Sequence, residues 1–208
     1  MTVYDQCYVT ICTNKKYLKG VLLLNESLKL VGSIYSLVCV VPNTIDEKII
    51  TYLHNKNIDV KNVESNITIN DNILNNNMQS NKEHWNETFF KFYVFGLIEF
   101  KKIVFLDADM VIMKNIDELF KKPHLTACCA GRLYPGNEDW KGINSGLMVI
   151  EPDKEITETL IEILYKTEDI FRGYGDQDII NRLYPDWHKQ NELHLSEHYN
   201  LFYHYVNL

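Results

Sequence analysis

The chain has 208 residues, of which 46% are hydrophobic and 24% are charged, and its net charge is −7. This length and composition are typical of one soluble globular domain with a sizeable core. The negative charge argues against nucleic acid as the main partner, because binding to a phosphate backbone favours a basic surface. It does not exclude a small phosphate-bearing ligand, since a bound divalent cation can supply positive charge locally.

No apolar run reaches the length of a membrane span, and the first one, at residues 8–12, is too short for a signal peptide. The chain has five cysteines, and their spacing is not that of a zinc site. We therefore expect a cytoplasmic protein without a membrane span, in which the cysteines are reduced and buried.

The first third of the chain alternates between apolar, strand-like runs and segments with helical spacing. Strands that alternate with helices indicate a mostly parallel sheet covered by helices on both faces. Ligands of such sheets bind beyond the carboxyl ends of the strands. In chain order we predict a strand over 7–12, a helix over 16–29, a strand over 35–41, a helix over 46–56 and a strand over 58–63.

The asparagine-rich stretch over 66–81 lacks periodicity, and we predict a mobile loop there. A helix rich in Phe and Tyr should follow over 86–100, and the last helix should begin at Asp176 as its N-cap. The remaining predicted elements are strands over 103–106, 126–130 and 142–150, and helices over 156–165 and 176–183.

Two carboxylates, Asp107 and Asp109, directly follow the apolar strand predicted over 103–106. They would repel each other without a counter-ion, so together they suit a hard divalent cation. An incomplete cage of oxygen ligands leaves positions for substrate phosphates, and the cation can neutralise charge on a leaving diphosphate. Taken alone, the pair is also compatible with a solvated turn after a strand.

Three other segments carry polar or flat groups at places where a ligand could bind. The first is the turn Asn144-Ser145-Gly146 beside a strand, the second is Gly175-Asp176-Gln177-Asp178 at a helix start, and the third is Tyr17, one turn after Asn14. Each also has a structural interpretation: an ordinary turn, a helix cap and a core aromatic side chain, respectively.

Together, and in this order, these segments resemble the glycogenin-like glycosyltransferases of family 8. The resemblance covers nearly the whole chain and is carried by DQCYVTICTNKKYLKGVLLLNESLK, KIVFLDADMVIMKNIDELF, GINSGLMVIEP and GYGDQDIINRLY. It implies an α/β, single-domain, Rossmann-like fold of the GT-A type over 1–208. The nucleotide-binding half would be 1–109, and the half that binds the sugar and the acceptor would be 110–208.

The resemblance also implies an activity, namely metal-dependent, retaining transfer of a hexose from a UDP-sugar. We expect glucose as the hexose, Mn²⁺ as the cofactor with Mg²⁺ as the alternative, and a protein or glycan acceptor that the sequence does not identify. A catalytically weak or inactive nucleotide-sugar-binding domain is the main alternative. A nucleotidyltransferase is less favoured, because residues 10–19 lack the glycine of a phosphate loop. The sequence does not determine the oligomeric state, and a homodimer is compatible with it.

The family pattern assigns a role to each matching residue. Asp107 and Asp109 would bind the metal, and Asp176 and Gln177 would act near the anomeric carbon. The residues expected to contact the nucleotide sugar are Ile11, Thr13, Asn14 and Tyr17 at the base, Lys82 and Lys91 as cations near the donor, Asp107, Ala108 and Asp109 at the diphosphate, and Asn144 and Ser145 at the sugar.

The sequence departs from the family pattern at two places that matter for the site. Gly173 stands where the family has a carboxylate, which leaves the identity of the donor sugar open. The family's later histidine motif, which supplies a third metal ligand, is not reached before Leu208. Either this is a truncated form, or the metal site is open, or another group serves, with His198 and His204 as minor candidates. Self-glucosylation at Tyr203 or Tyr205 is a minor alternative, since neither tyrosine has the matching offset.

Overall fold

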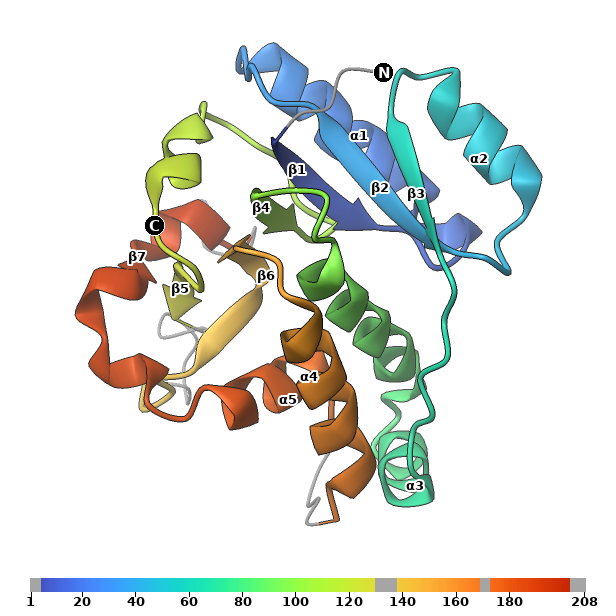
Figure 1. The fold of residues 1–208 in the computed structure, drawn as a ribbon, viewed down its shortest axis with the longest axis vertical. Helices are drawn as coiled ribbons and strands as arrows, with labels where there is room; N and C mark the ends of the chain where they lie inside the picture. Colours follow the sequence, from blue (N-terminus) through green and yellow to red (C-terminus); the bar gives the residue numbers. More distant parts are fainter. Residues whose placement is uncertain (1–4, 130–137, 169–172, 203–208) are drawn as a thin grey trace.

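The computed structural model describes residues 5–129, 138–168 and 173–202, and its helices lie on both faces of one sheet (Figure 1). The strands are β1 (Gln6–Ile11), β2 (Leu37–Pro42), β3 (Asp59–Val63), β4 (Lys102–Leu106), β5 (Ala127–Cys129), β6 (Ile143–Ile150) and β7 (His194–Leu195). The α-helices are α1 (Leu18–Leu30), α2 (Glu47–His54), α3 (Asp71–Gln79), α4 (Lys154–Lys166) and α5 (Asp176–Leu183). The 3₁₀ helices are η1 (Lys15–Tyr17), η2 (Glu83–Gly96), η3 (Asp117–Lys121), η4 (Trp187–Lys189), η5 (Asn191–Leu193) and η6 (Glu197–Asn200).

The sheet has seven strands in the order β3-β2-β1-β4-β6-β5-β7. Strand β6 runs antiparallel to both of its neighbours, β4 and β5, and the other neighbouring strands pair in parallel. The prediction of an α/β fold with a mostly parallel sheet is therefore confirmed. Because β6 is reversed, its first residues lie beside the carboxyl end of β4, which brings two polar segments to one edge of the sheet.

Both faces of the central strands are buried, which explains why these strands are apolar along their whole length. On β1, Val9 packs on the face covered by η2, α4 and α5, while Tyr8 packs on the face covered by α1, α2 and η3. The first core includes Phe92 of η2, and the second includes Leu24 of α1. The three-layer arrangement leaves the carboxyl ends of β1 and β4 to form a ligand site.

The loop predicted over 66–81 is wrong, because most of it forms the helix α3. Asn70 caps this helix by accepting a hydrogen bond from the N–H of Ile73. The same side chain donates to the carbonyl of Thr167, 2.7 Å away, and so attaches α3 to the end of α4. Ile73 is fully buried and anchors the helix in the core. The stabilising contacts are thus made with a distant segment.

The N-cap predicted for the last helix is also wrong, because Gly175 is the cap and Asp176 is the first helical residue. The carboxylate that serves this helix start belongs to Asp178, whose Oδ2 accepts from the N–H of Gly175 at 2.9 Å. The side chain of Asp176 is therefore free to turn toward other partners. Within the part of the chain that the structure describes, no helix is long and apolar enough to cross a membrane.

Candidate active site

The two aspartates of the sequence motif leave β4 in a tight turn at the edge of a pocket of about 440 Å³. Asp107 is half-buried, Ala108 is buried and Asp109 is exposed, and all three residues line the pocket. The turn lies against α1 at Gly20, where an added Cβ would be 2.2 Å from the carbonyl oxygen of Ala108. Only a glycine at this position lets the helix approach the turn so closely.

The start of β6 lies beside this turn because β6 is antiparallel to β4. The N–H of Asp107 donates to the carbonyl of Gly146 at 2.8 Å. Asn144 Oδ1 accepts from the N–H of Gly146 and from Asn200 Nδ2, each at 2.9 Å. A Cβ at Gly146 would lie 3.2 Å from Asp107 Oδ2, so the glycine keeps the two segments close together. Asn144 and Ser145 therefore line the same pocket as the aspartates.

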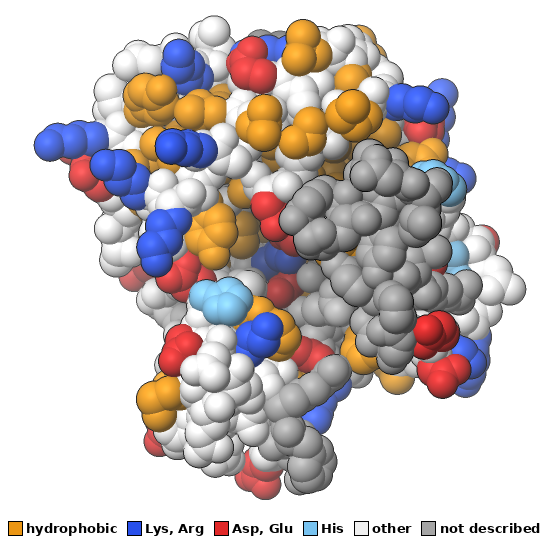
Figure 2. Space-filling model, turned by 180° about the vertical axis from the view of Figure 1, so that it is seen from behind, with side chains coloured by type: hydrophobic (Ala, Val, Ile, Leu, Met, Phe, Trp, Pro, Cys, Tyr) orange, Lys and Arg blue, Asp and Glu red, His pale blue; other side chains and the backbone are white. Residues whose placement is uncertain are grey.

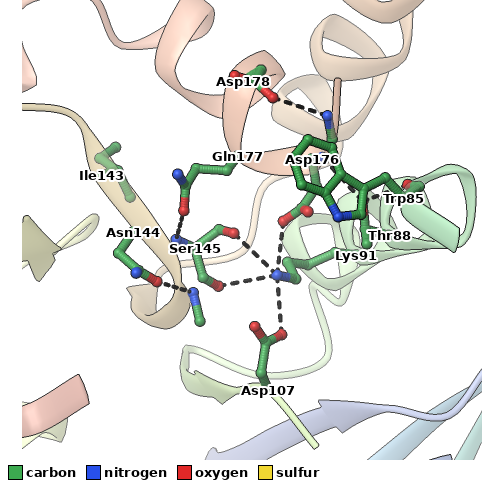
Figure 3. Close-up of polar contacts among 12 residues, drawn as sticks. Trp85, Thr88, Lys91, Asp107, Ile143, Asn144, Ser145, Asp176, Gln177 and Asp178 are labelled. Carbon is green, nitrogen blue, oxygen red and sulfur yellow. Dashed lines mark hydrogen bonds and ion pairs between the residues drawn. The ribbon is translucent and has the colours of Figure 1, made fainter. Parts of the chain in front are cut away.

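Lys91 of η2 lies at the centre of the site, as Figure 3 shows. Its Nζ is 2.7 Å from Asp176 Oδ2, 3.0 Å from Asp107 Oδ1, and 3.2 Å from both the carbonyl oxygen and Oγ of Ser145. It also lies 4.9 Å from the ring centre of Phe105. Only 3% of the lysine side chain is exposed, so the ammonium group is satisfied entirely by these neighbours. One buried cation thus joins β4, β6 and α5.

The electrostatics of this cluster follow from its burial and its two carboxylates. Burial disfavours the charged form of Lys91, but Asp107 and Asp176 outweigh this effect and raise the pKa of the lysine. Burial raises the pKa of Asp107 to about 6, with Asp176 and Asp109 acting in the same direction and Lys91 opposing them. The side chain is still 36% accessible, so its carboxylate can reach a ligand in the pocket. A lysine that stays charged in this position keeps two neighbouring acidic groups together.

The residues predicted to be catalytic begin α5 and face the pocket. Asp176 has 8% of its side chain exposed, and its N–H donates to Thr88 Oγ1 at 3.1 Å. Gln177 Oε1 accepts from the N–H of Ser145 at 3.2 Å, which orients the amide NH₂ away from Ser145. The carbonyl oxygen that could support a positive anomeric centre is therefore already hydrogen-bonded.

Asn181 fixes α5 to the start of β6 and was not predicted from the sequence. Its Oδ1 accepts from the N–H of Ile143 at 2.7 Å, and its Nδ2 donates to the carbonyl of the same residue at 3.0 Å. Nδ2 also donates to the carbonyl of Gln177 at 2.8 Å. The distance between Gln177 and the Asn144-Ser145 segment is therefore set by a side chain one helical turn behind the site.

The carboxyl end of β1 and the residues after it also contribute to the pocket. Ile11, Thr13 and Tyr17, which the sequence assigned to the base, line the pocket together with Glu87 of η2. Asn14 does not line the pocket; it donates from Nδ2 to Glu87 Oε2 at 2.5 Å. Burial and the negative charge of Glu87 raise the pKa of Tyr17, with smaller contributions from the two aspartates of the turn.

Lys82 is the other predicted residue that does not line the pocket. Its Nζ lies 4.8 Å from the ring centre of Trp85, which does line it. The stem of Lys82 also occupies the space beside Gly173, where an added Cβ would be 2.8 Å from Lys82 Cγ. A side chain at position 173 would therefore require this lysine to move.

Six pocket-lining residues were not predicted from the sequence. Three of them precede Lys91 by three to six residues on η2, at Trp85, Glu87 and Thr88, so helical periodicity counted back from Lys91 was the available signal. Figure 2 shows acidic and basic side chains gathered around a hollow in the face of the molecule opposite the view of Figure 1. The residues that were missed are His84, Trp85, Glu87, Thr88, Trp140 and Phe202, whereas Gly175 and Asp178 belong to a candidate segment that the sequence indicated.

The donor set of the turn suits a hard divalent cation. Asp107 Oδ2 and the exposed carboxylate of Asp109 are oxygen ligands of the kind that Mn²⁺ and Mg²⁺ prefer, and the open pocket leaves room for phosphate oxygens. Among the described residues, no group of three or more His, Cys, Asp or Glu side chains could hold a metal ion. His198 is exposed and contacts Ser196, and His204, Tyr203 and Tyr205 lie outside the described residues.

The comparisons with known proteins agree with this fold. The family model described as glycosyl transferase family 8 matches residues 8–207. Glycogenin-1 of Caenorhabditis elegans is 29% identical over 184 residues, covering 88% of this chain and 40% of the relative. UDP-glucuronate:xylan alpha-glucuronosyltransferase 1 of Arabidopsis thaliana is 34% identical over 130 residues, covering 62% of this chain and 18% of the relative.

Solved structures show the same fold. The glycosyltransferase GlyE of Streptococcus pneumoniae superposes with a TM-score of 0.63 at 19% identity, covering 94% of this chain and 46% of that one. The chain thus spans less than half the length of these three proteins. The match over residues 8–207 shows that the chain belongs to glycosyl transferase family 8 and has its GT-A fold.

Proposed function

We propose that this protein is a metal-dependent, retaining hexosyltransferase that uses a UDP-sugar donor. The turn Asp107-Ala108-Asp109 is called the metal-type turn below. The observation that carries the proposal is the position of Lys91, which pairs with Asp107 of this turn and with Asp176 on α5. Groups suited to a nucleotide, a diphosphate and a sugar thus line one pocket. On this proposal, residues 1–109 form the nucleotide-binding half, and residues 110–208 form the half that binds the sugar and the acceptor.

The pocket has groups suited to the base, the diphosphate and the sugar of the donor. Tyr17 offers a flat ring on which a uracil base can stack. Asp107 and Asp109 would hold Mn²⁺ or Mg²⁺, which supplies positive charge for the leaving diphosphate. Asn144 offers polar groups for sugar hydroxyls, and its amide is held by Asn200.

The ion pair of Asp176 favours one of two ways to retain the anomeric configuration. In one, a carboxylate attacks the sugar and forms a covalent intermediate; in the other, the acceptor approaches the face that the UDP leaves. Asp176 is buried and its Oδ2 lies only 2.7 Å from Lys91 Nζ, so the ion pair holds this oxygen in place and weakens it as a nucleophile, while the carboxylate stays negatively charged. We assign it the role of orienting the sugar and stabilising positive charge at the anomeric carbon.

The charge of the pocket favours a neutral hexose, with glucose as the expected one. Five acidic residues line the pocket, whereas Lys91 is the only lysine or arginine that does so among the described residues. A sugar carboxylate would add another negative charge to this site. The relative from Arabidopsis is named for a UDP-glucuronate donor. The acidic lining of this pocket supports the proposal of a donor sugar without a carboxylate.

A donor panel tests the proposal directly. The protein is incubated with UDP-glucose, UDP-galactose and UDP-glucuronate, with Mn²⁺ or with a chelator, and UDP release and intact mass are measured. We expect Mn²⁺-dependent release of UDP that is faster with the neutral hexoses. Mn²⁺-dependent UDP binding without release from any donor would support the alternative of an inactive nucleotide-sugar-binding domain.

A further inference from the structure

Glu87 places a carboxylate at the end of the pocket lined by Ile11, Thr13 and Tyr17. Thr13 Oγ1 donates to Glu87 Oε2 at 3.1 Å, and Asn14 Nδ2 donates to the same oxygen at 2.5 Å. Both donors reach Oε2, and no donor among the described residues reaches the other oxygen, Oε1. One oxygen of Glu87 is thus anchored by the protein, and the other is available to a ligand.

The orientation of Asn14 makes this arrangement specific. Asn14 caps η1, and its Oδ1 accepts from the N–H of Lys16 at 2.9 Å. The amide is therefore fixed with its NH₂ toward η2, where only an acceptor can receive it. A side chain at position 87 that carries an oxygen should therefore direct that oxygen toward Asn14.

We propose that Glu87 selects uracil by accepting a hydrogen bond from its N3–H, an inference that rests on the proposed UDP-sugar activity and names the residue that sets base specificity. Tyr17 and Glu87 line the same pocket, so a base stacked on Tyr17 can present its edge to Glu87. Uracil presents an N–H at N3, which suits Oε1. Cytosine presents a bare acceptor nitrogen at N3, which Oε1 would repel.

Glu87→Gln tests this inference directly, because Thr13 and Asn14 hold one side-chain oxygen of residue 87 in place. The side-chain oxygen of Gln would still be required by Asn14, so its NH₂ would take the place of Oε1. A donor would then face the base where an acceptor stood. The bridge from η2 to Asn14 would be kept, so a purely structural role of Glu87 would be undisturbed.

The experiment is a calorimetric titration of the whole chain with UDP and with CDP, both in the presence of Mn²⁺. We expect the parent protein to bind UDP about tenfold or more tightly than CDP, since a site built for one hydrogen-bonding pattern rejects its opposite. Glu87→Gln should abolish this preference or reverse it toward CDP. Glu83→Gln, which changes an exposed residue of the same helix outside the pocket, should leave the ratio unchanged.

Two further measurements separate the outcomes. Glu87→Ala should lose the preference without reversing it, and the parent should bind N3-methyluridine diphosphate as weakly as CDP. If the parent binds UDP and Glu87→Gln keeps the parent's ratio of UDP to CDP affinity, the inference is overturned while the proposed function stands. If the parent binds no UDP with Mn²⁺, the proposed function fails and this inference fails with it.

Discussion

The ammonium nitrogen of Lys91 lies 2.7 Å from the carboxylate of Asp176, and both side chains are almost completely buried. Removing one partner of a buried ion pair leaves an uncompensated charge, so Lys91→Met should lower the free energy of unfolding by about 3–5 kcal/mol. Urea denaturation in metal-free buffer measures this loss.

The matched control is Lys189→Met, which breaks the pair with Asp186 on the surface. Both of these side chains are about two-thirds exposed, at 66% and 69%, so their pair is screened by water. We expect a change of less than about 1 kcal/mol for this variant. Equal effects of the two substitutions would mean that Lys91 does not hold the site together.

Asp176→Asn should lower turnover by a large factor and leave UDP affinity nearly intact, because the contacts of Asp176 matter mainly in the transition state. Its stability should also fall, since the carboxylate pairs with Lys91 and is not the helix cap. Initial rates must therefore be measured well below the midpoint of thermal unfolding. A folded Asp176→Asn enzyme with the parent's rate would leave Asp176 without a role in the chemistry.

Tyr17→Ala should weaken UDP binding by about 1–3 kcal/mol, the range for stacking of a base on an aromatic ring. Tyr17→Phe keeps the ring, so it should bind UDP nearly as well as the parent. Titration of all three proteins with UDP and Mn²⁺ decides the matter. If Tyr17→Ala lowers the melting temperature but not the UDP affinity, the tyrosine is a core residue only.

Gly20→Ala should weaken metal-dependent UDP binding although residue 20 does not line the pocket. In an open helix, alanine is favoured over glycine by about 1 kcal/mol. Here its Cβ would lie 2.2 Å from the carbonyl oxygen of Ala108, so the turn that carries Asp107 and Asp109 must shift. Lys19→Ala, at an exposed neighbouring position, serves as the control. A more stable Gly20→Ala protein with unchanged UDP binding would show that the turn can move away from the helix without affecting the binding of UDP.

The sheet could be predicted from the sequence because both of its faces are buried, which makes the strands continuous apolar runs. The helix α3 could not, because six of its nine residues are polar and its capping residue, Asn70, binds carbonyls at the end of α4. Such a contact joins segments almost a hundred residues apart and leaves no local pattern.

The metal-type turn and the start of α5 were predicted from short motifs that are contiguous in the sequence. Glu87 and Trp85 were missed because they belong to no such motif, and they line the pocket only because η2 runs beside it. Asp176 was mistaken for a cap because its partner, Lys91, lies 85 residues away in the sequence. The role of Asp176 thus depends on its ion pair with Lys91, which the local sequence does not reveal.

The central claim is that Asp107 and Asp109 hold a divalent cation against the diphosphate of a UDP-sugar. Titration of UDP into Asp109→Asn, with and without Mn²⁺, tests it most directly, because an amide is a poor ligand for a hard cation and the exposed side chain is not needed for folding. Asp59→Asn, which changes an exposed carboxylate that does not line the pocket, is the control. We predict that the parent and Asp59→Asn bind UDP in a Mn²⁺-dependent manner and that Asp109→Asn loses at least about tenfold in affinity. An Asp109→Asn protein that binds UDP and Mn²⁺ like the parent would contradict the account.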